Sequence, residues 1–376
     1  MVHNTPKTRY LQPTVVEDLR EKMVFLGGPR QVGKTTLAKS LLARNAVYLN
    51  WDDAEDRSRI MRAQWSRDVP MLVLDEVHKY RLWRGLVKGL FDKRGPALKI
   101  LITGSARLDH FRKGGDSLVG RYHYHRLHPF TLGELGGART LDDLLRYGGF
   151  PEPFLKQDER FYRRWQKERV TRVVTQDLRD VETVKEISLV ELLADILPSR
   201  VGSQLSIKSL QEDLQVSPHT VERWLTILEN LYLCYRIAPH GAERAKAVKK
   251  AKKLYLWDWA QVDGEGARFE NLVASHLLKF CHAQEDREGH RMELRYMRDV
   301  DGKEIDFLVL RARKPLFAVE CKSGASRIAK HALYFKARYR IPKVYQVHTG
   351  EADFGNETDA GRVLPLRRLC ELEQLP

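Results

Sequence analysis

The segment GPRQVGKTT places two glycines, a lysine and two threonines in the spacing of a phosphate-binding loop. Gly28 and Gly33 would let backbone N–H groups turn toward phosphate oxygens, and the start of the next helix adds partial positive charge. Lys34 would reach the β- and γ-phosphates of ATP, and the Thr35 hydroxyl would bind Mg²⁺. The expected ATP-binding residues are Gly28, Pro29, Arg30, Gln31, Val32, Gly33, Lys34, Thr35 and Thr36.

A pair of acids follows the apolar run MLVL and supplies the partners of that loop. We expect Asp75 to bind the same Mg²⁺ and Glu76 to orient or deprotonate the attacking water. A strand that merely ends in two solvated acids would have the same sequence pattern. The phosphate loop upstream favours a role for these acids in ATP hydrolysis.

Two further side chains are candidates for the same reaction. The run ILITGSAR predicts a central strand whose polar end brings Thr103 or Ser105 to the γ-phosphate or the water. Arg121, in SLVGRY, is a candidate arginine finger for a neighbouring subunit's site, where it would offset charge on the γ-phosphate. An ordinary surface arginine remains the alternative for Arg121.

A second set of chemical residues lies in EIDFLVLRARKPLFAVECK, residues 304–322. Asp306 and Glu320 interrupt apolar strands, and Lys322 shares a strand face with Glu320 because side chains alternate. Two carboxylates could bind Mg²⁺ while Lys322 helps to activate water, and Glu270 on a preceding helix could complete the acidic cluster. This pattern resembles the restriction-endonuclease-like nuclease signature. A salt-bridge network in a domain that only binds nucleic acid is the alternative.

These residues require a particular arrangement of elements. Short apolar runs alternate with helical stretches before residue 160, so we predict a parallel α/β sheet with helices on both faces. The chain 161–240 reads as helical, and Ser217-Pro218 predicts a helix start. The apolar residues that follow fall on one helical face: Val221, Trp224, Leu225, Leu228 and Leu231. A helix, a turn, a second helix and a strand form a winged-helix pattern. It could place Ser217, His219, Thr220 and Arg223 at a DNA groove, or serve only for packing.

The overall composition points to a folded protein with a polyanionic partner. The 376 residues are 43% hydrophobic and 31% charged, with a formal net charge of +15. A basic excess of this kind favours nucleic acid, and no apolar run is long enough for a membrane span. Residues 236–253 alone carry seven Lys or Arg against one acid, which indicates phosphate contacts or a solvated loop. The four scattered cysteines suggest reduced thiols in the cytoplasm.

The chain resembles the prokaryotic AAA-type P-loop ATPases that carry a C-terminal domain of unknown function. The matching segments lie between about residues 23 and 324: GPRQVGKTTLAKSLL, LVLDEVHK, LITGSAR, SLVGRYHYHRLHPFTLGEL, YGGFPEP, SPHTVERWLTILENLYL, KLYLWDWA, ARFENLVASHLL and GKEIDFLV…AVECKSG. The resemblance implies that Arg121 acts across subunits and that the C-terminal part is restriction-endonuclease-like. It also implies a closed homo-oligomeric ring, hexameric or similar.

Together these features predict an AAA-type ATPase domain at 1–160, a winged-helix-like helical domain at 161–240, and a restriction-endonuclease-like α/β domain at 241–376. Three functions remain open. One is an ATP-driven ring that binds and remodels duplex or branched DNA, with or without cutting it. The second is an ATP-dependent regulatory switch that binds a protein partner and has neither motor nor nuclease activity. The third is a nuclease whose cutting depends on the ATP state.

Overall fold

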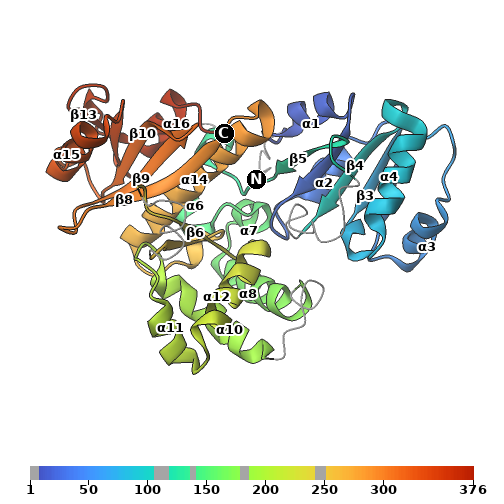
Figure 1. Ribbon diagram of the computed structural model, residues 1–376, viewed down its shortest axis with the longest axis horizontal. Coiled ribbons are helices and arrows are strands. Elements are labelled where there is room, and N and C mark those ends of the chain that lie inside the picture. The colour runs from blue at the N-terminus through green and yellow to red at the C-terminus, as the bar shows by residue number, and fades with distance from the viewer. Residues whose placement is uncertain (1–7, 106–117, 136–140, 178–185, 242–250) are drawn as a thin grey trace. The chain divides into compact units, whose positions relative to one another are not determined.

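The computed structural model describes residues 8–105, 118–135, 141–177, 186–241 and 251–376. Contacts divide the chain into two compact units. Unit 1 comprises residues 1–129, 176–183 and 230–232, and unit 2 comprises residues 130–175, 184–229 and 233–376. Figure 1 shows the elements of both units, coloured along the chain.

Unit 1 is built on a parallel sheet of five strands in the order β2-β3-β4-β1-β5. The strands and helices are α1 (Gln12–Asp18), β1 (Met23–Gly27), α2 (Lys34–Ser40), β2 (Val47–Asn50), α3 (Ala54–Arg62), β3 (Met71–Asp75), α4 (Trp83–Arg94), β4 (Lys99–Gly104) and β5 (Tyr122–Arg126). The predicted parallel sheet is therefore confirmed. The helix after the phosphate loop ends at Ser40, before Leu41 and Leu42.

Helices cover both faces of this sheet. One face forms a core of alternate strand residues such as Phe25, Leu74 and Ile102, against which Ile60 of α3 and Val87 of α4 pack. On the other side, α1 contacts β1 and α2 contacts β4. Because all five strands run the same way, their carboxyl ends meet at one edge, where the loops that follow β1, β3 and β4 converge.

The first part of unit 2 is helical and includes the predicted helix-turn-helix. Its helices are α5 (Leu132–Leu135), α6 (Leu141–Tyr147), α7 (Pro151–Lys156), α8 (Glu159–Arg172), α10 (Ile187–Ile196), α11 (Ile207–Leu214) and α12 (Pro218–Asn230). The Ser217 hydroxyl accepts the Thr220 backbone N–H at 3.1 Å, which confirms the predicted helix start. The predicted apolar face of α12 is buried: Val221, Trp224, Leu225, Leu228 and, just beyond the helix, Leu231.

An antiparallel pair, β6 (Cys234–Ile237) and β7 (Lys253–Leu256), follows α12. The rest of unit 2 is a six-stranded mixed sheet in the order β12-β13-β11-β10-β9-β8. Its elements are α14 (Glu265–Glu288), β8 (Met292–Arg298), β9 (Glu304–Arg311), β10 (Lys314–Cys321), α15 (Lys330–Tyr339), β11 (Val344–His348), β12 (Phe354–Asn356), β13 (Gly361–Pro365) and α16 (Leu366–Leu372). Figure 1 shows the long helix α14 running beside this sheet.

Packing on the sheet of unit 2 fixes the neighbourhood of the second candidate site. Ala332 and Phe335 of α15 join the core made by β8, β9, β10 and β11. Helix α14 contacts β7, β8, β9 and β10, and its Phe280 ring lies 6.0 Å from that of Phe317. One helix therefore touches both the β6–β7 pair and the large sheet.

Candidate functional site

The phosphate loop of unit 1 connects β1 to α2 and has the backbone that its glycines allow. Gly28 has φ +150°, and a Cβ at this position would lie 2.4 Å from the backbone oxygen of Leu127. Gly33, at φ +97°, is the residue directly before α2. Both positions exclude larger residues, because a side chain would clash at Gly28 and would strain the backbone at Gly33.

Lys34 is buried, and its ammonium donates to the carbonyl oxygens of Gly28 and Pro29, each at 2.8 Å. In this position the lysine side chain is folded back over its own loop. A phosphate that enters the loop would compete with these two carbonyls for the ammonium, since both are hydrogen-bond acceptors.

Asp75 ends β3 at the same edge of the sheet, and three hydroxyl groups donate to it. Thr35 and Tyr48 each lie 2.7 Å from its Oδ2, and Thr103 donates to its Oδ1. Burial opposes ionisation, but the hydrogen bonds from Thr103, Tyr48 and Thr35 hold the pKa of Asp75 below its usual value. An ionised carboxylate beside the Thr35 hydroxyl is an oxygen donor set that suits Mg²⁺. The Mg²⁺ site itself stays a prediction.

Glu76 follows Asp75 in the left-handed backbone region, at φ +56°. The Ser105 hydroxyl donates to its Oε2 at 3.1 Å, and His78 Nε2 lies 3.6 Å from the same oxygen. Burial raises the pKa of Glu76 to about 7, although the charge of Lys34 opposes this rise. A carboxyl group that titrates near neutral pH is well matched to accept a proton from water.

Arg121 lies away from this edge. Its backbone oxygen accepts the N–H of Met23 at 3.0 Å, so it precedes β5 at the amino end of the sheet. Gly28 is five residues beyond Met23 along the strand, a distance of about 16 Å at 3.3 Å per residue. The guanidinium forms an exposed ion pair with Asp92 at 2.6 Å. Arg121 therefore does not reach the phosphate loop of its own chain.

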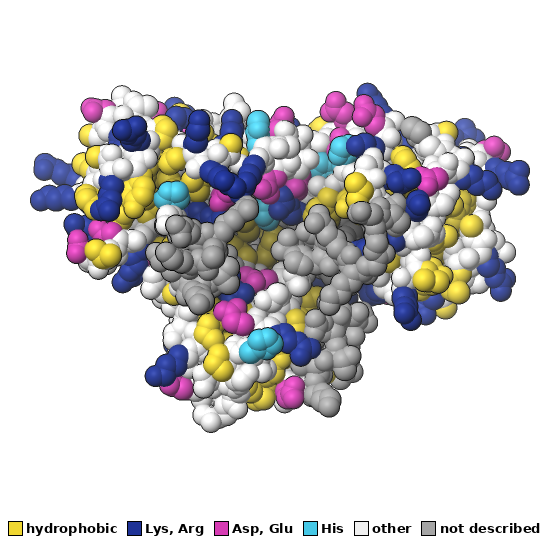
Figure 2. Space-filling view, viewed as in Figure 1, with side chains coloured by type: hydrophobic (Ala, Val, Ile, Leu, Met, Phe, Trp, Pro, Cys, Tyr) yellow, Lys and Arg dark blue, Asp and Glu magenta, His cyan; other side chains and the backbone are white. Residues whose placement is uncertain are grey.

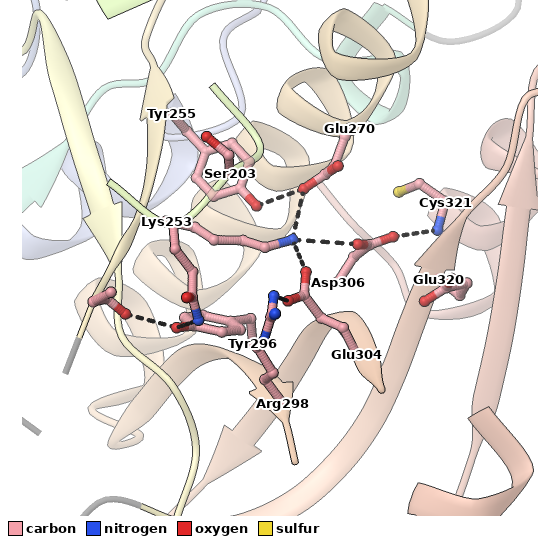
Figure 3. Close-up of polar contacts among 12 residues, drawn as sticks. Ser203, Lys253, Tyr255, Glu270, Tyr296, Arg298, Glu304, Asp306, Glu320 and Cys321 are labelled. Atoms are coloured by element: carbon pink, nitrogen blue, oxygen red, sulfur yellow. Dashed lines mark hydrogen bonds and ion pairs between the residues drawn. The ribbon is translucent and has the colours of Figure 1, made fainter. Parts of the chain in front are cut away.

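The second candidate site, in unit 2, is organised by a residue that the sequence did not single out as central. Lys253 of β7 is buried, and its ammonium lies 2.5 Å from Glu304, 3.2 Å from Glu270 and 3.4 Å from Asp306. Figure 3 shows these carboxylates converging on the lysine from α14 and β9. The predicted acids Glu270 and Asp306 are thus brought together, with an ammonium group between them.

Glu320, another predicted member of this site, lies on the far side of Asp306 from Lys253 in Figure 3. The second oxygen of Asp306 accepts the backbone N–H of Cys321 at 2.9 Å. Glu320 is buried and pairs with Lys322 at 2.7 Å and with His331 at 3.1 Å. Within the described ranges, no group of three or more His, Cys, Asp or Glu side chains is arranged to hold a metal ion. The predicted metal set therefore stays a prediction.

Burial also raises the pKa of Asp306, to about 8, with the charges of Glu270 and Glu320 adding to the effect and Lys253 opposing it. The same burial raises the pKa of Glu270. The pKa of Lys253 is raised despite its burial, because Glu270, Asp306 and Glu304 surround it. Burial thus favours the protonated forms of Asp306 and Glu270, and the surrounding carboxyl groups favour the charged form of Lys253.

The position of Lys253 corrects one interpretation of the basic segment 236–253. Lys253 is buried in the cluster, and Arg236 is buried between Glu222 and Glu229, at 2.6 and 2.9 Å. Their assignment to phosphate contacts is wrong, because neither cation faces solvent. Arg244, Lys246, Lys249 and Lys250 lie outside the described residues.

Comparisons with known proteins agree with the geometry of unit 1. Residues 20–136 match a family model described as an AAA domain. Two further models, each described as a domain of unknown function, match residues 138–261 and 265–369. The N-terminal match supports the predicted AAA-type P-loop ATPase family, whereas the restriction-endonuclease-like fold at the C-terminus finds no support in these matches.

The chain is similar to full-length proteins without an assigned role. An uncharacterized protein of Mycobacterium tuberculosis is 23% identical over 352 residues, which are 86% of this chain and 78% of that one. One from Haemophilus influenzae is 23% identical over 354 residues, covering 83% and 85% of the two chains.

Among solved structures, a Signal Transduction ATPase with Numerous Domains protein from Pyrococcus horikoshii, with a tetratricopeptide repeat sensor, aligns at 14% identity and a TM-score of 0.25. The alignment covers 74% of this chain and 48% of that one. In the described part of the present chain, no helix has the length and apolar character of a membrane span.

The pKa of Glu76 leads to a prediction about pH. A proton acceptor must be ionised, so kcat/KM for ATP hydrolysis should rise as the pH increases through about 7. Glu76→Gln should lower turnover about 100-fold or more and remove this dependence. His78→Gln is the matched control, since it removes the neighbouring titratable group. If the dependence disappears in His78→Gln and persists in Glu76→Gln, the assignment to Glu76 is wrong.

The ion cluster leads to a prediction about stability. Lys253→Met should destabilise the protein by about 3–5 kcal/mol at neutral pH, because it leaves buried carboxylates without their cation. Lys252→Met, at the adjacent half-buried position, should change stability by less than about 1 kcal/mol. Urea unfolding of the two variants measures the difference. Equal midpoints would show that the cluster does not depend on the Lys253 charge.

Proposed function

We propose that the chain is an ATP-hydrolysing AAA-type enzyme that assembles into a ring and acts on DNA. The observation that carries the ATPase part is the meeting of Thr35, Asp75 and Glu76 at the carboxyl edge of the unit 1 sheet. This edge supplies an oxygen donor pair for Mg²⁺ and a proton acceptor next to it. The AAA-domain match over residues 20–136 supports the same activity.

In this proposal each residue of the nucleotide site has a separate role. Thr35 and Asp75 would hold the Mg²⁺, which neutralises charge on the bound phosphates. Lys34 exchanges the carbonyls of Gly28 and Pro29 for phosphate oxygens. Glu76 accepts a proton from the attacking water, and the Ser105 hydroxyl holds its carboxylate in place.

The position of Arg121 supports the proposed ring. Because this residue precedes β5 at the amino edge, the arginine-finger role requires the phosphate loop of a neighbouring copy. The Asp92 ion pair would be exchanged for contact with the γ-phosphate at that interface. A homo-oligomer of the hexameric kind provides such an interface at every site.

DNA is the proposed partner because of the net charge of +15 and the helix-turn-helix with its strand pair. His219 and Arg223 are exposed on α12, whereas its apolar face is buried. On the face shown in Figure 2, Lys and Arg side chains occur over many elements with acidic groups between them. Phosphate contacts spread over several elements therefore fit this surface better than one basic stripe.

We further propose that the C-terminal domain holds DNA without cutting it. Lys253 already supplies the positive charge that Glu270 and Asp306 need, and Glu320 is paired with Lys322 and His331. Nicking of DNA by the wild-type protein with Mn²⁺, and its loss in Glu320→Ala, would overturn this part of the proposal.

The DNA proposal predicts that duplex or four-way-junction DNA stimulates ATP hydrolysis. Stimulation and binding should both weaken as salt rises, because phosphate contacts release counterions. The double variant His219→Glu, Arg223→Glu should bind less tightly and show a shallower salt slope, while Lys208→Glu on α11 should behave as wild type. The Lys34→Ala variant, which should not hydrolyse ATP, serves as the control for background ATPase activity. If no DNA form changes the ATPase rate, the protein-binding regulatory switch replaces this proposal.

Assembly leads to a prediction for mixed chains. Arg121→Ala alone should hydrolyse ATP slowly, and Lys34→Ala alone should be inactive. Mixed together they should regain activity, since some interfaces then pair an intact phosphate loop with an intact arginine. Asp92→Asn is the control: it frees Arg121 from its ion pair and should not lower the rate. Mixtures that exchange subunits yet stay inactive would rule out a site shared between subunits.

A further inference from the structure

Tyr48 of β2 contacts the carboxylate of Asp75 in unit 1, although the sequence alone assigns Tyr48 no role. Strands β2 and β3 are parallel neighbours, with Tyr48 opposite Val73 and Asn50 opposite Asp75. The Tyr48 side chain extends along the strand direction, and its hydroxyl reaches Asp75 Oδ2 at 2.7 Å. The ammonium of Lys39 lies 4.5 Å from the centre of the Tyr48 ring. The phenol is thus held between α2 and the end of β3.

Asp75 is held from both neighbouring strands. Tyr48 donates from β2 to Oδ2, and Thr103 donates from β4 to Oδ1. The third donor, Thr35, belongs to the phosphate-loop helix and shares Oδ2 with Tyr48. Strand donors are fixed by the ladder of the sheet, whereas Thr35 would also have to coordinate a metal. The rotation of the Asp75 carboxylate is therefore set by Tyr48 and Thr103.

The phenol remains a donor under all ordinary conditions. A tyrosine hydroxyl ordinarily keeps its proton at neutral pH, so it donates to the Asp75 carboxylate at 2.7 Å. A carboxylate offers about four lone-pair positions, and these three hydroxyls occupy three of them. The arrangement therefore leaves room for one further partner at Asp75, direct or through a water molecule.

We propose that Tyr48 is a positioning residue for the magnesium-bound nucleotide: its hydroxyl orients the Asp75 carboxylate toward Thr35. The inference rests on the proposed nucleotide site and adds a residue outside both nucleotide-binding motifs. Groups that orient a metal ligand typically change metal affinity or activity about 10–100-fold when they are removed. If the Tyr48 side chain served only for packing, loss of its hydroxyl would leave the Mg²⁺-dependent nucleotide affinity unchanged.

The test is Tyr48→Phe, which removes only the hydroxyl oxygen. The dissociation constant for ADP is measured by calorimetry in Mg²⁺ and in EDTA, so that no turnover is needed. We expect the affinity in EDTA to match wild type and the gain on adding Mg²⁺ to fall about tenfold. Asp75→Asn should lose most of the gain, and Lys39→Met should keep it, since it retains the phenol.

The outcomes separate this inference from the proposed function. If Tyr48→Phe retains the full Mg²⁺-dependent gain of wild type, the positioning role is wrong and the ATP site stands. If wild type shows no ADP binding, or no gain with Mg²⁺, the nucleotide site and the role of Tyr48 both fall. If Tyr48→Phe weakens ADP binding equally in Mg²⁺ and in EDTA, Tyr48 acts on the nucleotide itself or on packing. That result also overturns the inference.

Discussion

Asp75 must stay ionised at a buried position, and much of unit 1 is arranged around that requirement. The carboxylate has little water around it, so its charge depends on donors from the protein. Those donors come from β2, β4 and the helix that follows the phosphate loop. The strand order β2-β3-β4 is what places Tyr48 and Thr103 on its two sides. The order of the strands thus determines which hydroxyl groups donate to Asp75 at the end of β3.

Unit 2 also buries carboxyl groups, but it balances their charge with a lysine and not with hydroxyl donors alone. Several carboxyl groups are buried near one another, and hydroxyl donors alone would not balance them. A lysine from β7 supplies a full charge, while the raised pKa values of Glu270 and Asp306 reduce the negative charge opposing it. At Asp75 the donors are neutral hydroxyl groups. In the second cluster the cation is part of the chain itself.

The sequence predicted those parts of the site that are encoded by neighbouring residues. The phosphate loop, the acidic pair after β3, the Ser217 helix start and the buried face of α12 all follow from local spacing. The sequence pattern also groups Glu270 with Asp306 as a candidate acidic cluster, because it resembles a nuclease signature.

The residues that sequence reasoning missed depend on contacts between distant segments. Tyr48 lies in an apolar run, and its partner is known only once β2 is placed beside β3. Lys253 ends a basic segment, which suggested a solvent-facing role. Its partner Asp306 is 53 residues away, and no local pattern marks one lysine of such a segment as buried. Arg236 was misread for the same reason.

The long helix α14 also limits where residues can be inserted into or deleted from unit 2. Asn271 binds the backbone of Leu256 through both side-chain atoms, Glu270 contacts Lys253, and Phe280 packs against Phe317 of the large sheet. With 3.6 residues per turn, one residue inserted between Asn271 and Phe280 would rotate the two contact sets by about 100° relative to each other. Insertions and deletions in relatives should therefore fall in the connecting loops, and the spacing within α14 should stay constant even where side chains vary.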